Sequence, residues 1–164
     1  EALTIILKRN DPSAVAKQVS LTELGSIKIN KEERGKMLKA IPRNSIIGFL
    51  IGVLPGAGAT IASFLAYGME RNFVSDEEKE KFGKGSVHGL TAPETANNAA
   101  CSGAFVPLLT LGIPGSGTTA VMLGALLGFG IQPGPRLYIT NPEIFWSVIM
   151  SMYIGMVVLL ILHS

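Results

Sequence analysis

Charged residues are confined to two stretches of this chain. Residues 85–164 contain three charged side chains, namely Glu94, Arg136 and Glu143, and residues 44–69 contain none. The other 23 charges lie in residues 1–43 and 70–84. A soluble domain spreads charge over its surface, whereas a membrane protein places charge at the ends of its spans. The pattern therefore predicts an all-α, polytopic membrane protein.

The composition agrees with a membrane protein and excludes several other classes. Charged residues make up 16% of the chain, against roughly 25% in a soluble domain. The 19 glycines and 9 prolines lie mostly within apolar segments, and both residues are more frequent in membrane helices than in soluble ones. A net charge of +2 predicts no nucleic-acid partner. The single Cys101 excludes a disulfide framework, and His88 and His163 are too isolated to predict a metal site.

The charge pattern divides the chain into two regions. Residues 1–43 carry nine Lys or Arg and five Asp or Glu, a net charge of +4, so the positive-inside rule predicts a cytoplasmic loop segment. Within it, Asp11-Pro12 predicts a helix start, and Lys31–Ala40 predicts a second short helix. Residues 44–164 are expected to form a transmembrane transport region, which is partial and contains a charged, water-facing loop at 70–85.

The first apolar segment is interrupted at its centre. Ile46–Tyr67 is long enough to cross a hydrocarbon core of about 30 Å, but Pro55-Gly56-Ala57-Gly58 lies in its middle. Proline removes a backbone donor, and glycine loosens the helix on both sides. We expect two half-helices that meet at Pro55–Gly58; a single helix with a proline kink is the alternative. The spacing of Gly48, Gly52 and Gly56 predicts close helix packing.

A second interruption follows at residues 112–119. Pro93 predicts a helix start with Glu94 in its first turn, and this helix should run toward Thr110. The apolar stretch Ala120–Ile131 follows the interruption, so we expect a re-entrant helical hairpin with a polar tip at 112–119. Ile144–Leu162 predicts a last helix long enough to span.

The predicted substrate-binding residues lie at the two interruptions. The second one combines backbone N–H groups, hydroxyls and a helix start within Pro114, Gly115, Ser116, Gly117, Thr118 and Thr119. Helix N-termini carry partial positive charge and bind anions without a basic side chain. Two broken apolar segments in one chain point to a transporter binding site, so Gly56 and Gly58 are assigned to it as well. The sequence therefore predicts a site for a carboxylate.

The same segment does not carry an enzyme motif. Gly112-x-x-x-x-Gly117-Thr118-Thr119 copies the spacing of a P-loop, but Thr118 replaces its lysine and no βαβ pattern surrounds it. Ser116 lacks a GxSxG frame, because Pro114 stands two positions before it. We find no nucleophile–base pair and no metal-ligand set, so neither an enzyme nor a cofactor is predicted.

Three polar residues lie in the apolar segment before this tip. Asn97 and Asn98 are adjacent amides, and burying an unpaired amide in hydrocarbon costs several kcal/mol. They either make hydrogen bonds between helices or bind substrate or a coupling cation. Glu94 is either a helix cap or a third cation-coupling residue, since carboxylates within a membrane are functional by default.

Four segments of the chain resemble a known transporter family. Residues 48–60, 92–100, 111–116 and 132–135 read GFLIGVLPGAGAT, APETANNAA, LGIPGS and QPGP. These motifs closely resemble the large membrane subunit of the tripartite tricarboxylate transporters, the TctA family. The resemblance covers about Arg43 to Pro135, and it departs from the family at His88, where a glutamate is frequent.

The resemblance implies a function as well as a fold. It implies a multi-pass subunit of a secondary transporter in the bacterial inner membrane, which takes up citrate-like tricarboxylates or related carboxylates by symport with Na⁺ or H⁺. The expected partners are a small membrane subunit and a periplasmic solute-binding protein. The chain would be a fragment from the start of the second half of such a subunit. A non-transporting membrane scaffold or anchor subunit is the alternative.

Overall fold

The structure, a computed structural model, describes residues 29–162. The chain divides into two units, residues 1–34 and 35–164, and the predicted helix start at Asp11 lies outside the described residues. Within the described part, all regular structure is helical. The helices are α3 (Lys31–Val53), α4 (Gly58–Phe73), α5 (Asp76–Lys79), α6 (Val87–Gly103), α7 (Phe105–Leu111), α8 (Gly117–Gly128), α9 (Leu137–Thr140) and α10 (Pro142–Leu162). The all-α prediction is confirmed.

Helix α3 is longer than the sequence pattern predicts. The short helix expected at Lys31–Ala40 continues through Pro42 to Val53. Proline inside a helix removes one backbone hydrogen bond and clashes with the preceding turn. One face of α3 is nevertheless buried along its length, at Ala40, Asn44, Gly48 and Gly52. Packing of this face outweighs the cost of the proline, so the charged and apolar segments share one helix.

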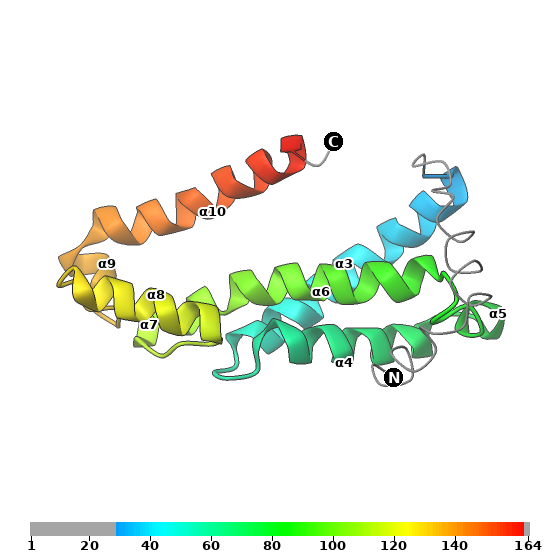
Figure 1. Cartoon of the computed structure of the whole chain (residues 1–164), viewed down its shortest axis with the longest axis horizontal. Helices are drawn as coiled ribbons and strands as arrows, with labels where there is room; N and C mark the ends of the chain where they lie inside the picture. Colours follow the sequence, from blue (N-terminus) through cyan, green and yellow to red (C-terminus); the bar gives the residue numbers. More distant parts are fainter. Residues whose placement is uncertain (1–28, 163–164) are drawn as a thin grey trace, which may run out of the picture. The chain divides into compact units, whose positions relative to one another are not determined.

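The predicted break at Pro55–Gly58 is confirmed. Helix α3 ends at Val53, α4 begins at Gly58, and Gly56 and Gly58 have φ angles of 81° and 65°. The alternative of one kinked helix is therefore wrong. Helix α4 folds back toward the start of α3, as the ion pair between Arg43 of α3 and Glu70 of α4 shows (Figure 1). The charge-free segment is thus a helical hairpin with its tip at residues 54–57 rather than one broken crossing.

Small residues pack the hairpin against α6. A buried cluster joins Ala62 and Ala66 of α4 to Ala96 and Ala100 of α6. The predicted close packing of glycines is confirmed for Gly48 and Gly52, whose Cα positions leave no space for a side chain next to Ala96 and Ala100. Gly56 lies in the tip, where a Cβ would meet nothing within 4 Å.

Helix α6 begins earlier than predicted. It starts at Val87, and the Ser86 hydroxyl caps it by accepting a hydrogen bond from the Gly89 N–H. Pro93 therefore lies inside the helix, and Glu94 is an exposed residue in its second turn rather than a cap. The Ser86 cap and the burial of His88, Thr91 and Ala92 explain the earlier start.

The second interruption is confirmed, but its geometry differs from a hairpin. Gly112 (φ 72°) ends α7 and packs against the carbonyl of Pro133, which follows α8. The chain then returns along α7, since Gly115 packs against Ala104 at the start of α7. Helix α8 leaves this point in the direction of α7 (Figure 1). The arms are not antiparallel, because residues 112–116 make the return in extended form.

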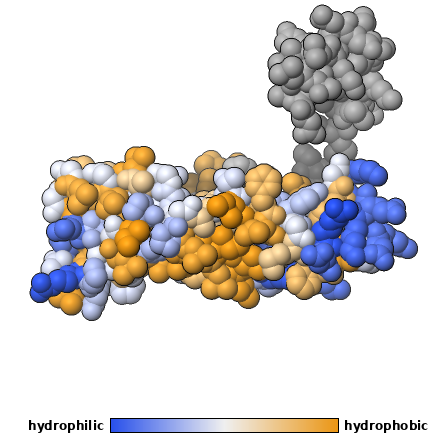
Figure 2. Space-filling view, turned by 90° about the horizontal axis from the view of Figure 1, so that it is seen from below, coloured by the Kyte–Doolittle hydropathy of each residue, from blue (hydrophilic) through white to orange (hydrophobic). Residues whose placement is uncertain are grey.

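Helix α10 carries the clearest membrane signal. Within residues 29–162 it alone is long and apolar enough to cross a membrane. On the face drawn in Figure 2, apolar side chains gather over the middle, and hydrophilic side chains gather at the end that carries α5 in Figure 1. Polytopic character is therefore not established by helix length alone.

Candidate functional site

The two interruptions meet at one cavity, which we call the tip cavity. It has a volume of about 330 Å³ and is lined by Gly56, Gly58, Ala59, Thr60, Ala100, Cys101, Phe105, Ser116, Gly117, Thr118 and Thr119. Six of the ten predicted substrate-binding residues therefore line it. A Cβ on Gly58 would lie 3.9 Å from the Cβ of Ser116. The tip of the hairpin and the start of α8 are thus neighbours in space although 58 positions separate them in sequence.

Two helix N-termini converge on the tip cavity. Gly58, Ala59 and Thr60 form the first turn of α4, which has no side-chain cap. Gly117, Thr118 and Thr119 form the first turn of α8. The first backbone N–H groups of a helix have no partner within it, and each N-terminus carries about half a positive charge. The cavity therefore has positive electrostatic character without a basic side chain.

The Ser116 and Thr119 side chains build the start of α8. Ser116 Oγ accepts a hydrogen bond from the Thr119 N–H, and Thr119 Oγ1 accepts one from the Ser116 N–H at 2.8 Å. The Ser116 and Thr119 hydroxyls, which the sequence analysis predicted to bind substrate, are therefore largely used in this reciprocal capping box. Thr118 is exposed and takes no part in the cap, so the cap leaves its hydroxyl and the N–H groups of Gly117 and Thr118 available beside the cavity.

The remaining predicted tip residues, Pro114 and Gly115, lie next to the tip cavity but do not line it. Gly115 is buried, and a Cβ there would lie 3.0 Å from Ala104 and 3.2 Å from the carbonyl oxygen of Gly52. Pro114 is half-buried beside it and does not line the cavity. Both residues fix the extended return of the chain, and they do so through packing.

The polar residues of α6 separate into two groups. Asn97 lies in an adjacent cavity with Thr60, Ser63 and Tyr67, and its side-chain amide donates a hydrogen bond to Ser63 Oγ at 3.2 Å. Thr60 lines both cavities, so Asn97 lies next to the tip cavity. Asn98 and Glu94 are exposed and line neither cavity.

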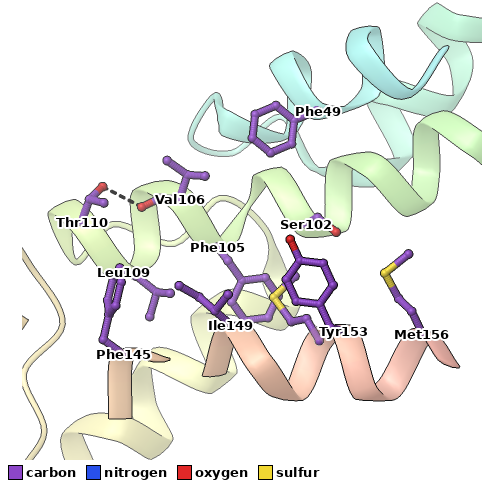
Figure 3. Close-up of a pocket in the computed structure, with 11 residues that line it drawn as sticks. Phe49, Ser102, Phe105, Val106, Leu109, Thr110, Phe145, Ile149, Tyr153 and Met156 are labelled. Carbon is purple, nitrogen blue, oxygen red and sulfur yellow. Dashed lines mark hydrogen bonds between the residues drawn. The ribbon is translucent and has the colours of Figure 1, made fainter. Parts of the chain in front are cut away.

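A larger cavity lies apart from the predicted residues. It has a volume of about 370 Å³, and side chains of α10 such as Ile149 and Met156 face Phe105 and Leu109 across it (Figure 3). Its lining is almost entirely apolar. A carboxylate would lose its hydration there without gaining partners, so this cavity does not suit an anion.

The sequence did not reveal a buried ionic cluster at the other end of the hairpin. Glu70 is fully buried and accepts hydrogen bonds from Arg43, from Asn44 Nδ2 at 2.8 Å, and from His88, whose Nδ1 lies 2.7 Å from Oε1. Burial by itself raises the pKa of Glu70, but these hydrogen bonds outweigh it and hold the pKa below its usual value. One signal existed: Arg43 and Glu70 lie at equal distances in sequence on either side of Pro55–Gly58.

Comparison with known proteins identifies the family. The model of the tripartite tricarboxylate transporter TctA family matches residues 1–164. The chain belongs to the TctA family. TctA proteins are transporter subunits and not enzymes, in agreement with the sequence prediction.

Two curated relatives come from Agrobacterium vitis. The chain is 39% identical over 155 residues to an uncharacterized 52.8 kDa protein in the TAR-I ttuC′ 3′ region, covering 94% of the chain and 30% of the relative. It is 46% identical over 116 residues to an uncharacterized protein in the TAR-II ttuC′ 3′ region, covering 71% of the chain and 47% of the relative. The chain thus spans less than half the length of these relatives. No solved structure matches it.

Proposed function

We propose that this TctA chain is part of the membrane subunit of a secondary transporter for tricarboxylates or related carboxylates. The subunit would work with a small membrane subunit and a periplasmic solute-binding protein in the bacterial inner membrane. One observation carries the proposal: the N-termini of α4 and α8 open on one cavity between the two broken segments. Aligned N–H groups compensate the negative charge of a carboxylate in a region that has few basic side chains.

The hairpin of α3 and α4 would enter the membrane without crossing it. Its charge-free arms, residues 44–53 and 58–69, each correspond to about 15–18 Å of helix, roughly half of a hydrocarbon core of about 30 Å. A tip at mid-depth exposes backbone N–H groups, which is tolerated in a membrane only where protein or a wet cavity meets them. The tip cavity supplies such an environment, and α10 would cross the membrane completely.

The carboxylate would bind to the free N–H groups of Gly117 and Thr118 and to the Thr118 hydroxyl. Ser116 would act mainly by holding the start of α8 in place through its capping box. Asn97, Ser63 and Thr60 offer oxygen atoms beside this site and form the preferred place for Na⁺ as a coupling cation. Asn98 and Glu94 contribute less, since neither lines these cavities.

The test uses the full-length subunit with its two partners in proteoliposomes. Uptake of labelled citrate is measured for wild type, Thr118→Val, and Ser151→Ala as a control whose hydroxyl bonds to its own helix. Loss of a hydrogen bond to a charged group costs about 1.5–3 kcal/mol, so Thr118→Val should weaken apparent affinity at least about tenfold. Unchanged affinity in Thr118→Val would exclude the tip cavity as the substrate site.

A second measurement separates a transporter from a passive anchor. Cys101 is exposed and lines the tip cavity, so a thiol reagent should reach it in a protein that lacks other reactive cysteines. Citrate should slow this labelling if it binds the cavity. No protection and no uptake in the assembled complex would favour the anchor subunit.

A further inference from the structure

The buried cluster at the base of the hairpin has the geometry of a proton-binding site. It joins three helices, since Arg43 and Asn44 come from α3, Glu70 from α4 and His88 from α6. Glu70 is fully buried and His88 is 8% exposed. Neither the tip cavity nor the proposed carboxylate site uses these residues, so their burial calls for a separate explanation.

The hydrogen bonds determine which nitrogen of His88 carries hydrogen. Both oxygens of Glu70 accept hydrogen bonds from Arg43, so the carboxyl is ionised and can only accept from the imidazole. In the neutral ring Nδ1 therefore carries the hydrogen and donates to Oε1, and Nε2 is left with a free lone pair. In the part of the chain that the structure describes, Asn44 Oδ1 is the sole fully buried side-chain polar atom without a partner. No residue of this part hydrogen-bonds to His88 Nε2, and the His88 side chain keeps a small exposed surface.

We infer that His88 is a proton-binding residue of this transporter, taking up a proton from water at Nε2 while Nδ1 stays bonded to Glu70. This inference rests on the proposed function, because it identifies one site for its coupling ion. Protonation adds one positive charge and breaks no bond to Glu70. The resulting imidazolium is stabilised by the carboxylate.

Proton binding would change how the carboxylate is shared between helices. Oε1 of Glu70 accepts from both Arg43 Nη2 and His88 Nδ1. A charged imidazolium competes more strongly for Oε1 than a neutral ring does, because it adds the attraction between opposite charges to the hydrogen bond. Arg43 keeps its bond to Oε2 and its stacking on Phe73, whose ring centre lies 4.4 Å from the guanidinium. Proton binding therefore strengthens the bond of Glu70 to His88 of α6 at the expense of its Oε1 bond to Arg43 of α3.

Few charged side chains bond to His88 and its partners, so a change of charge at His88 can be tested by substitution. Among residues 29–162, the charged side chains that hydrogen-bond within the cluster are Arg43 from α3 and Glu70 from α4. A second ionic network joins Lys36 of α3 to Glu78 of α5, which also pairs with Lys81. Tyr67 of α4 packs on Phe82. A change in charge at His88 thus acts mainly on Glu70 and Arg43.

The experiment measures citrate uptake by the full-length complex between about pH 5 and 8, the interval in which histidine changes charge. His88→Gln keeps an N–H donor for Glu70 but takes up no proton in this interval. His163→Gln replaces the other histidine of the chain and is the control. The ratio of His88→Gln to wild-type uptake should change at least about threefold across the interval, while the control ratio stays constant. Using ratios removes the effect of citrate protonation. A constant ratio for His88→Gln would overturn the inference.

A second variant tests the same site independently. Glu70→Gln removes the carboxylate that accepts the hydrogen bond from His88 Nδ1, so the pH profile of uptake should shift relative to wild type. An unshifted profile in a correctly assembled Glu70→Gln complex contradicts the inference. Failure of the proposed function looks different, because wild-type complex would then show neither uptake nor citrate protection of Cys101 at any pH.

Discussion

Replacing Gly48 with alanine tests the packing that holds the hairpin against α6. A Cβ at Gly48 would lie 2.3 Å from the carbonyl oxygen of Ala96 and 2.5 Å from its Cα. Unbonded carbon and oxygen atoms approach to about 3.3 Å, so the two helices would have to separate by roughly 1 Å. The contacted atoms belong to the backbone, so no change of rotamer relieves the overlap. Overpacking of this kind costs about 1–3 kcal/mol.

The matched control lies in the same helix. A Cβ at Gly35 would meet nothing within 4 Å, so Gly35→Ala should gain up to about 1 kcal/mol from helix propensity. Thermal unfolding of the purified full-length protein should therefore place Gly48→Ala below wild type and Gly35→Ala at or above it. Gly52→Ala, whose Cβ would lie 2.3 Å from the carbonyl oxygen of Ala100, should behave like Gly48→Ala. Equal melting temperatures for Gly48→Ala and Gly35→Ala would refute the close packing.

Three further predictions concern the tip, the base of the hairpin and its topology. Gly58→Leu should abolish uptake while leaving the protein in the membrane, because Gly58 has a φ of 65° and lines the tip cavity; uptake like wild type would contradict this. Because the pKa of Glu70 is lowered in the folded state, its ionised carboxylate stabilises the fold at pH values above the ordinary carboxyl pKa. This contribution to stability is lost as the pH falls through the folded-state pKa. Acid unfolding should therefore be less pH-dependent in Glu70→Gln, and identical pH dependence would count against the cluster. A cysteine at Lys36 should react with impermeant thiol reagents only from the cytoplasmic side, and labelling from outside intact cells would reverse the topology.

The elements predicted well are those in which local chemistry determines the backbone. The breaks at Pro55–Gly58 and at residues 112–116 follow from proline, from glycine and from left-handed φ angles at Gly56, Gly58 and Gly112. These constraints act within a few residues, so the sequence alone displays them. The polar lining of the tip cavity followed from the same segments.

The elements predicted poorly depend on contacts between distant residues. Pro42 and Pro93 look like helix boundaries, yet both lie inside helices whose buried faces continue past them. The buried cluster was missed because Glu70 borders a charged loop, where a carboxylate is normally solvated. Only the folding back of α4 on α3 brings Arg43 to it, and that direction is not encoded in any local pattern.

The two ends of the α3–α4 hairpin differ in what holds them in place. At the base, the buried carboxylate of Glu70 has partners on α3 and α6. Replacing Arg43 would remove its positively charged partner, and breaking a buried ion pair in this way typically costs about 3–5 kcal/mol. At the tip, α4 starts without a side-chain cap, and Gly56 is exposed with no neighbour for a Cβ. Segments with few buried contacts open at low free energy, so movement should begin at the tip and pivot about the base. Since the tip lines the proposed carboxylate site and the base contains the proposed proton site, a single hairpin connects the two.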